Sequence, residues 1–167
     1  MTMPYLKRFN SVDILISQLN PIVQTGTDPL VLSAMAGIVA VEAVTAYELA
    51  IKDIFEEFSS KKNIVFGSFV KTTYSKLNGR IKYQDVKTMI KAYGEKYSKR
   101  FEIKKDKQSK TVLALNHVDL VQAYDNLILG RHTFVHEGVL TMTLQEAISN
   151  YNIGKELIAA LYETMKR

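Results

Sequence analysis

The stretch Thr27-Asp28-Pro29, followed by LVLSAMAGIVAVEAVTAYELAIKDIFEEF over residues 30–58, decides the fold of this 167-residue chain. It opens with a cap residue and with proline at the first helical position, both favoured at helix starts. Gly37 is its only helix breaker. The first half is apolar on nearly all sides, and the second half narrows to an apolar stripe opposed by charged residues. This pattern is typical of a helix that is buried at one end and half exposed at the other. We therefore expect it to be the central helix.

The flanking segments also have a helical period. Apolar residues recur at steps of three and four over 1–21, 65–77, 86–97, 116–138 and 143–165. Asn116 and Thr143 are expected caps, Gly138 suits a helix C-terminus, and Ser59–Asn63 is expected to be a polar loop. Thr25-Gly26 and Asn78-Gly79 are turn signals. No segment has a convincing period of two. The sequence predicts one all-α domain, residues 1–167, built as a bundle of five or six helices.

Composition limits the class of protein. Apolar residues make up 47% of the chain, and it contains no cysteine. This excludes disulfides and thiolate metal sites. No signal-peptide pattern is visible, and Glu42 interrupts the best membrane candidate, so we expect a soluble cytoplasmic protein that does not contact a membrane. The net charge of +5 is compatible with a nucleic-acid partner.

Most of that charge lies in one segment. Between Lys91 and Lys110 there are eight basic and three acidic residues, an excess equal to the net charge of the whole chain. From Lys99 to Lys110 the segment is polar and shows no periodicity, which suits a solvated, mobile loop. Alternatively it contacts phosphates. On the second interpretation, the expected RNA-binding residues are Lys99, Arg100, Lys104, Lys105 and Lys107.

The stretch RHTFVHEG over residues 131–138 ends the helical segment 116–138. Three ordinary interpretations are open. Basic side chains are favoured in the last turn of any helix, and so short a pattern also arises by chance. As a third possibility, His132 and His136 are four residues apart, as zinc ligands can be, but the glutamate of a zinc-protease helix is missing. We expect no metal and no cofactor.

A functional interpretation rests on the chemistry of these side chains. Cleavage of RNA through attack of the ribose 2′-hydroxyl on the adjacent phosphate needs a base, an acid and positive charge near the phosphate. Histidine exchanges protons near neutral pH, and arginine binds phosphate oxygens with a permanent charge. His136 is the candidate acid or base, Arg131 the phosphate clamp, and His132 a second proton donor or an orienting group.

The stretch 127–138, LILGRHTFVHEG, resembles the signature of HEPN-domain ribonucleases, especially the RiboL-PSP-like group: arginine, a polar residue, mostly apolar residues, then histidine and a nearby glycine. Arg131, His132, His136 and Gly138 occupy those positions. The resemblance implies an all-α fold and metal-independent cleavage to 2′,3′-cyclic phosphate and 5′-hydroxyl ends. It also implies a toxin or antiviral effector restrained by an antitoxin or sensor protein.

Helix geometry poses a difficulty for a site within one chain. Residues five apart lie about 140° apart around a helix, so Arg131 and His136 point away from each other unless the helix unwinds. One chain also supplies only one His136 for a reaction that needs both an acid and a base. Both difficulties ease if two chains meet about a two-fold axis. The resemblance implies such a homodimer with a composite site.

Two other classes of protein stay open. One is a non-catalytic HEPN-like module that binds a nucleotide or a partner protein, such as an antitoxin or a nucleotidyltransferase. The other is a helical interaction protein in which residues 131–138 are only a helix end. The second predicts a monomer, or a dimer formed through another face.

Overall fold

Helix α2 (Pro29–Lys62) is the axis of the fold. The computed structural model describes residues 3–24, 27–77, 81–138 and 142–166, and for Asn20 and residues 22–24 the backbone alone. The Asp28 carboxylate accepts a hydrogen bond from the Leu30 backbone N–H at 2.7 Å, and Pro29 occupies the first turn. The expected start of the central helix is therefore confirmed. The turn signals at Thr25-Gly26 and Asn78-Gly79 lie outside the described residues.

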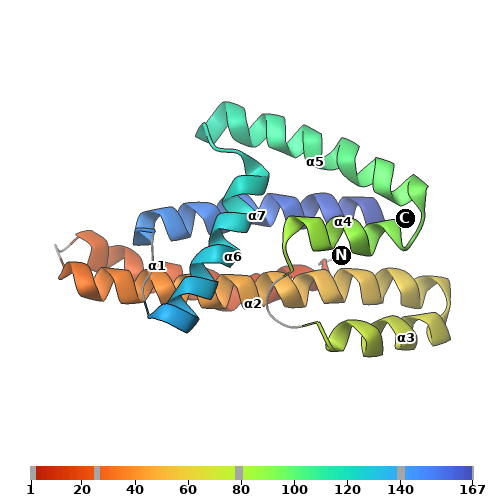
Figure 1. Ribbon diagram of the computed structural model, residues 1–167, viewed down its shortest axis with the longest axis horizontal. Helices are drawn as coiled ribbons and strands as arrows, with labels where there is room; N and C mark the ends of the chain where they lie inside the picture. The colour runs from red at the N-terminus through yellow and green to blue at the C-terminus, as the bar shows by residue number, and fades with distance from the viewer. Residues whose placement is uncertain (1–2, 25–26, 78–80, 139–141, 167) are drawn as a thin grey trace.

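The other elements surround α2, and no strand occurs in the part of the chain that the structure describes (Figure 1). They are η1 (Pro4–Phe9), α1 (Asn10–Gln24), α3 (Ile64–Ser75), α4 (Tyr83–Lys91), α5 (Glu95–Asn116), α6 (Leu120–Glu137) and α7 (Leu144–Met165). The all-α prediction is confirmed. The described residues form seven α-helices, so the expected number of five or six was too low.

Helix α5 accounts for the difference. Residues Lys99 to Lys110, for which a loop was one expectation, lie within a continuous helix of 22 residues. It is rich in lysine, which favours helices, and has no proline or glycine after Gly94. Its buried stripe is sparse, with only Phe101 and Val112 buried, and it packs along α7. Because α5 has so few apolar positions, its helical period was not recognisable in the sequence.

Several helix ends also differ from expectation. Helix α1 continues past Pro21, and α2 continues through Ser59–Lys62, where a loop was expected. Asn116 ends α5 instead of starting the next helix. His117 follows in the left-handed conformation (φ 56°), and Asp119 is the true cap of α6, since its carboxylate accepts from the Gln122 N–H at 2.8 Å. Asp119, and not Asn116, is therefore the residue that marks the start of α6.

The core lies between α2 and α7, which run side by side in the same direction (Figure 1). Tyr47 stacks on Tyr124 of α6 and on Tyr151 of α7, with ring centroids 5.2 and 6.1 Å apart. The Tyr47 hydroxyl donates to the Tyr151 carbonyl at 2.7 Å. These aromatic contacts fix α6 across the other two helices, and α6 carries the predicted site.

By length and mean hydropathy, α2 also meets the requirements of a membrane span. In the sequence, the charged Glu42 interrupts the apolar run and argues against a membrane span. In the structure, many α2 residues are buried against other helices of the bundle. A core helix of a soluble protein passes the same test as a membrane span.

Candidate active site at the end of helix α6

Helix α6 places the motif beyond the edge of the bundle core. It starts near the end of α5, crosses α7 and α2, and ends on the other side of α2 (Figure 1). Its first half is buried through Leu120, Ala123, Tyr124, Leu127 and Ile128. From Arg131 to Phe134 the side chains are half buried, and from Val135 to Gly138 they are exposed. The motif therefore sits on a firmly packed helix but reaches the surface.

One contact fixes the motif turn onto α2. The Phe134 ring lies against Gly37, so close that a Cβ atom added at Gly37 would stand 2.2 Å from the Phe134 Cε2 atom. Only glycine leaves room for this approach. In the sequence, Gly37 stood out only as a helix breaker. In the structure, it makes room for the Phe134 ring that holds the motif against α2.

The helix ends cleanly after the motif. Gly138 has a φ of 69°, in the left-handed region, and its N–H donates to the Phe134 carbonyl at 3.1 Å. This is the glycine C-cap that the sequence predicted. Because the helix is regular through Glu137, Arg131 and His136 stay about 140° apart around the axis. The helix does not unwind to bring the two side chains together.

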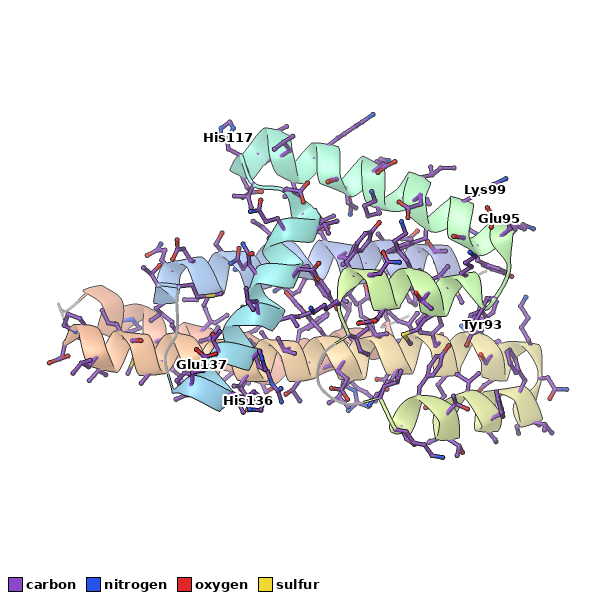
Figure 2. The ribbon with its side chains drawn as sticks, viewed as in Figure 1. Tyr93, Glu95, Lys99, His117, His136 and Glu137 are labelled. Carbon is purple, nitrogen blue, oxygen red and sulfur yellow. The ribbon has the colours of Figure 1, made fainter. Side chains whose placement is uncertain are left out.

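The two histidines of the motif share one face of α6. Their ring centroids lie 4.6 Å apart, with the ring planes at 62°. His132 is half buried, with its Nδ1 atom out of contact with solvent, whereas His136 is exposed. In Figure 2 His136 and Glu137 project from the end of α6. Exposure of His136 leaves its ring accessible to a substrate.

Arg131 faces a different direction. It lies on the side of α6 that is buried further up the helix, close to the direction of Tyr124 and Leu127, but it is only half buried at this level. Among the described residues, none forms a hydrogen bond or an ion pair with its guanidinium. The five donors of this group are therefore available to an anion.

A metal set at this site would need a third ligand besides the two histidines. Within residues 3–24, 27–77, 81–138 and 142–166, no group of three His, Cys, Asp or Glu side chains comes together in a way that could hold a metal ion.

The predicted RNA-binding residues lie elsewhere. Figure 2 shows Lys99 on α5, on the opposite side of α2 and α7 from His136. The structure thus does not bring this segment together with the motif in one chain. Two of its members are tied into the fold: the Arg100 guanidinium donates to the Glu163 carbonyl at 3.2 Å, and Lys105 pairs with Glu102 and Asp106.

Electrostatics confirm that Lys105 is engaged. Partial burial alone would lower its pKa, but the bond to Asp106 and the interactions with Tyr83 and Glu102 together raise the pKa above the usual lysine value. Lys99 and Lys107 remain exposed, and Lys104 is half buried. Of the five predicted residues, Lys99 and Lys107 are the best placed to meet a phosphate.

Sequence reasoning missed a cavity beside the motif. It opens between α6 and the first turns of α7 and is lined by Val118, Asn126, Leu129, Met142, Glu146, Ser149 and Asn150. The residues on each helix follow one another at helical steps of three and four, but nothing in the sequence indicates that the two faces meet. Only the packing of α6 on α7 brings them together.

Comparison with known proteins gives one match. The family model described as RiboL-PSP-HEPN matches residues 5–167, nearly the whole chain. No curated protein and no solved structure matches.

Proposed function

This chain belongs to the RiboL-PSP-HEPN family, and from that premise we propose that it is a metal-independent RNA endonuclease whose site is the end of α6. The observation that carries the proposal is the placement of RHTFVHEG: an accessible His136 and an available Arg131 on a helix end that Phe134 holds against Gly37. Members of this family are commonly ribonucleases.

The reaction follows from these groups. A base takes the proton of the ribose 2′-hydroxyl, the resulting oxygen attacks the adjacent phosphorus, and the bond to the 5′-oxygen breaks as an acid protonates that oxygen. The products carry a 2′,3′-cyclic phosphate and a 5′-hydroxyl. His136 transfers the protons, and Arg131 stabilises the charge that develops on the phosphate oxygens. His132, 4.6 Å away by ring centroids, orients His136 or supplies a second proton.

The regular end of α6 supports a composite site made by two chains. Since Arg131 and His136 diverge by about 140° on an unbroken helix, a partner copy would supply the missing group beside each one. An exposed apolar side chain lies within the motif: Val135 on α6 is 50% exposed. Pairing of two α6 ends would cover it.

Exposed lysines on α5 are the proposed contacts for the RNA backbone away from the cut. Because Lys99 lies across the molecule from His136, an RNA that touches both must follow the protein surface or reach α5 of the partner chain. By analogy with its family, the protein would act as a toxin or antiviral effector under the control of an antitoxin or sensor protein.

The second candidate is a non-catalytic module that binds a nucleotide or a partner protein. The burial of His132 Nδ1 favours it, because a histidine held by the fold can be structural. On this account His136 is exposed without transferring a proton.

The test is an assay of RNA cleavage in EDTA. The wild type, Arg131→Ala and His136→Ala are compared on a mixed RNA pool, with His117→Asn as the control histidine, since asparagine tolerates the left-handed φ of 56° at that position. We expect EDTA-resistant cleavage that falls about 10²- to 10⁴-fold in His136→Ala, the usual contribution of a general acid or base, and persists in His117→Asn.

Two outcomes would refute the proposal. Loss of wild-type cleavage in EDTA would favour a metal site at His132 and His136. Absence of cleavage in a correctly folded wild-type dimer, together with retained nucleotide or protein binding, would favour the non-catalytic module.

A further inference from the structure

The cavity between α6 and α7 has the size of a ligand site. Its volume is about 390 Å³, and small-molecule sites occupy roughly 300–1,000 Å³. Its lining combines apolar surface from Val118, Leu129 and Met142 with polar groups from both helices. The polar groups are the Asn126 and Asn150 amides, the Ser149 hydroxyl and the Glu146 carboxylate. A flat, hydrogen-bonding ligand suits such a lining.

The charge of the lining excludes a phosphate as its occupant. None of the seven lining residues is lysine or arginine, and the one charged group is the Glu146 carboxylate. Glu146 Oε2 accepts from the Thr143 backbone N–H at 2.7 Å and from its hydroxyl at 2.9 Å. These bonds lower the pKa of Glu146, so it is ionised at neutral pH. The cavity therefore repels anions and suits a neutral group with hydrogen-bond donors.

The cavity and the proposed catalytic histidine lie on one face of α6. Leu129 and His136 are seven residues apart, which places them about 20° apart around the helix and about 10 Å apart along its axis. A single-stranded RNA whose phosphate reaches His136 therefore passes the cavity within a short stretch of chain. Its next group on that side is a base.

We propose that this cavity binds one nucleobase of the RNA chain, beside the phosphate cut at His136. The proposal rests on the nuclease function proposed above and adds which bases of the RNA the site prefers. Asparagine amides donate to ring nitrogens and accept from amino groups, as in their paired bonds to adenine. The Glu146 carboxylate also accepts from an amino group. The cavity thus selects the bases that carry an exocyclic amino group, which are adenine, cytosine and guanine, over uracil.

The first experiment measures binding without cleavage. The full-length Arg131→Ala/His136→Ala variant is titrated with AMP, CMP and UMP while the NMR signals of Leu129, Ser149 and the asparagine side-chain amides are followed. We expect AMP and CMP to shift these signals at lower concentration than UMP. Adding Asn126→Ala/Asn150→Ala is expected to weaken AMP binding about tenfold, through loss of two hydrogen bonds.

The matched control is Asn152→Ala, an exposed asparagine on α7 outside the cavity lining, which should leave AMP binding unchanged. The cavity site is refuted if no nucleotide shifts these signals, or if the Asn126→Ala/Asn150→Ala change leaves binding intact. Equal binding of AMP and UMP would refute the selection of amino-bearing bases.

The second experiment separates this site from the nuclease itself. Cut positions of the wild type are mapped on a mixed-sequence RNA, and we expect a base preference at one position beside the cut that Asn126→Ala/Asn150→Ala flattens. Cleavage with an unchanged preference in that variant would refute the cavity site and leave the nuclease standing. Nucleotide binding in the cavity without any RNA cleavage would refute the nuclease and support the nucleotide site.

Discussion

At the scale of single residues, two glycines fix the end of α6. Gly37 lets the Phe134 ring approach the backbone of α2, and Gly138 ends the helix directly after the motif. Neither glycine carries chemistry. Both decide where Arg131 and His136 stand, since a shift of the helix end moves both side chains.

Replacing Gly138 tests the helix end. At φ 69° an alanine is strained by roughly 1–2 kcal/mol, whereas asparagine visits this region more readily. We expect Gly138→Ala to lower the free energy of unfolding by about 1 kcal/mol and Gly138→Asn by less, as measured by urea denaturation. Equal losses for the two variants would show that the left-handed conformation is not what limits this position.

Replacing Gly37 tests the contact between Phe134 and α2 that holds the motif in place. An alanine Cβ would overlap the Phe134 ring, so the ring or the helix must move. We expect Gly37→Ala to destabilise the protein by about 1–3 kcal/mol, the usual cost of overpacking, and to reduce RNA cleavage by more than its effect on folding explains.

The control is Ala34→Ser, an exposed position one turn away on the same helix, where surface substitutions change stability by no more than about 0.5 kcal/mol. A Gly37→Ala protein with wild-type stability and activity would contradict the role given to this contact.

At the scale of elements, the strongest sequence patterns were the most informative. The apolar period and the caps at Asp28 and Thr143 predicted α2 and α7, and Gly138 predicted the end of α6. Helix α5 was missed because only Phe101 and Val112 are buried among its 22 residues, so its period was too sparse to detect. Helix propensity and its packing on α7 stabilise it instead.

The start of α7 provides a test of pH dependence. Bonds from the Thr143 backbone N–H and hydroxyl lower the pKa of Glu146 below its usual 4.5. A carboxyl group whose pKa is lower in the folded state contributes stability above its unfolded pKa and loses it as the pH falls through the folded one. We expect the difference in unfolding free energy between wild type and Glu146→Gln to be largest at neutral pH and to shrink below about pH 4.5.

Urea titrations over that pH range measure the difference, with Glu137→Gln, at the exposed end of α6, as the control. A gap between wild type and Glu146→Gln that stays constant with pH would show that the ionised carboxylate does not stabilise the helix start.

At the scale of the whole molecule, the sequence predicted the motif and its helix but not the surroundings. Arg131 and His136 were proposed as site residues because they lie close together in the chain, in the order of the family signature. Asn126 and Asn150, 24 residues apart, line one cavity only because α6 crosses α7. The basic segment showed the reverse: it stood out in the sequence, yet the fold places it across the molecule from the motif.

The composite site makes a prediction about mixtures. If each site needs groups from two chains, an excess of the inactive Arg131→Ala/His136→Ala protein captures wild-type chains in mixed dimers. We expect the activity per wild-type chain to fall as the variant is added, after the mixture has re-equilibrated. Activity that does not change with added variant, while mixed dimers are detected, would indicate a site contained in one chain.

The central claim is that the residues at the end of α6 cut RNA through attack of the RNA's own 2′-hydroxyl on the adjacent phosphate. The most direct measurement compares an RNA oligonucleotide that the wild type cuts with the same oligonucleotide carrying one 2′-deoxyribose on the 5′ side of the cut. The account predicts that the all-ribose strand is cut to a 2′,3′-cyclic phosphate and that the substituted strand stays intact at that position. Cleavage of the substituted strand at the same bond would contradict it.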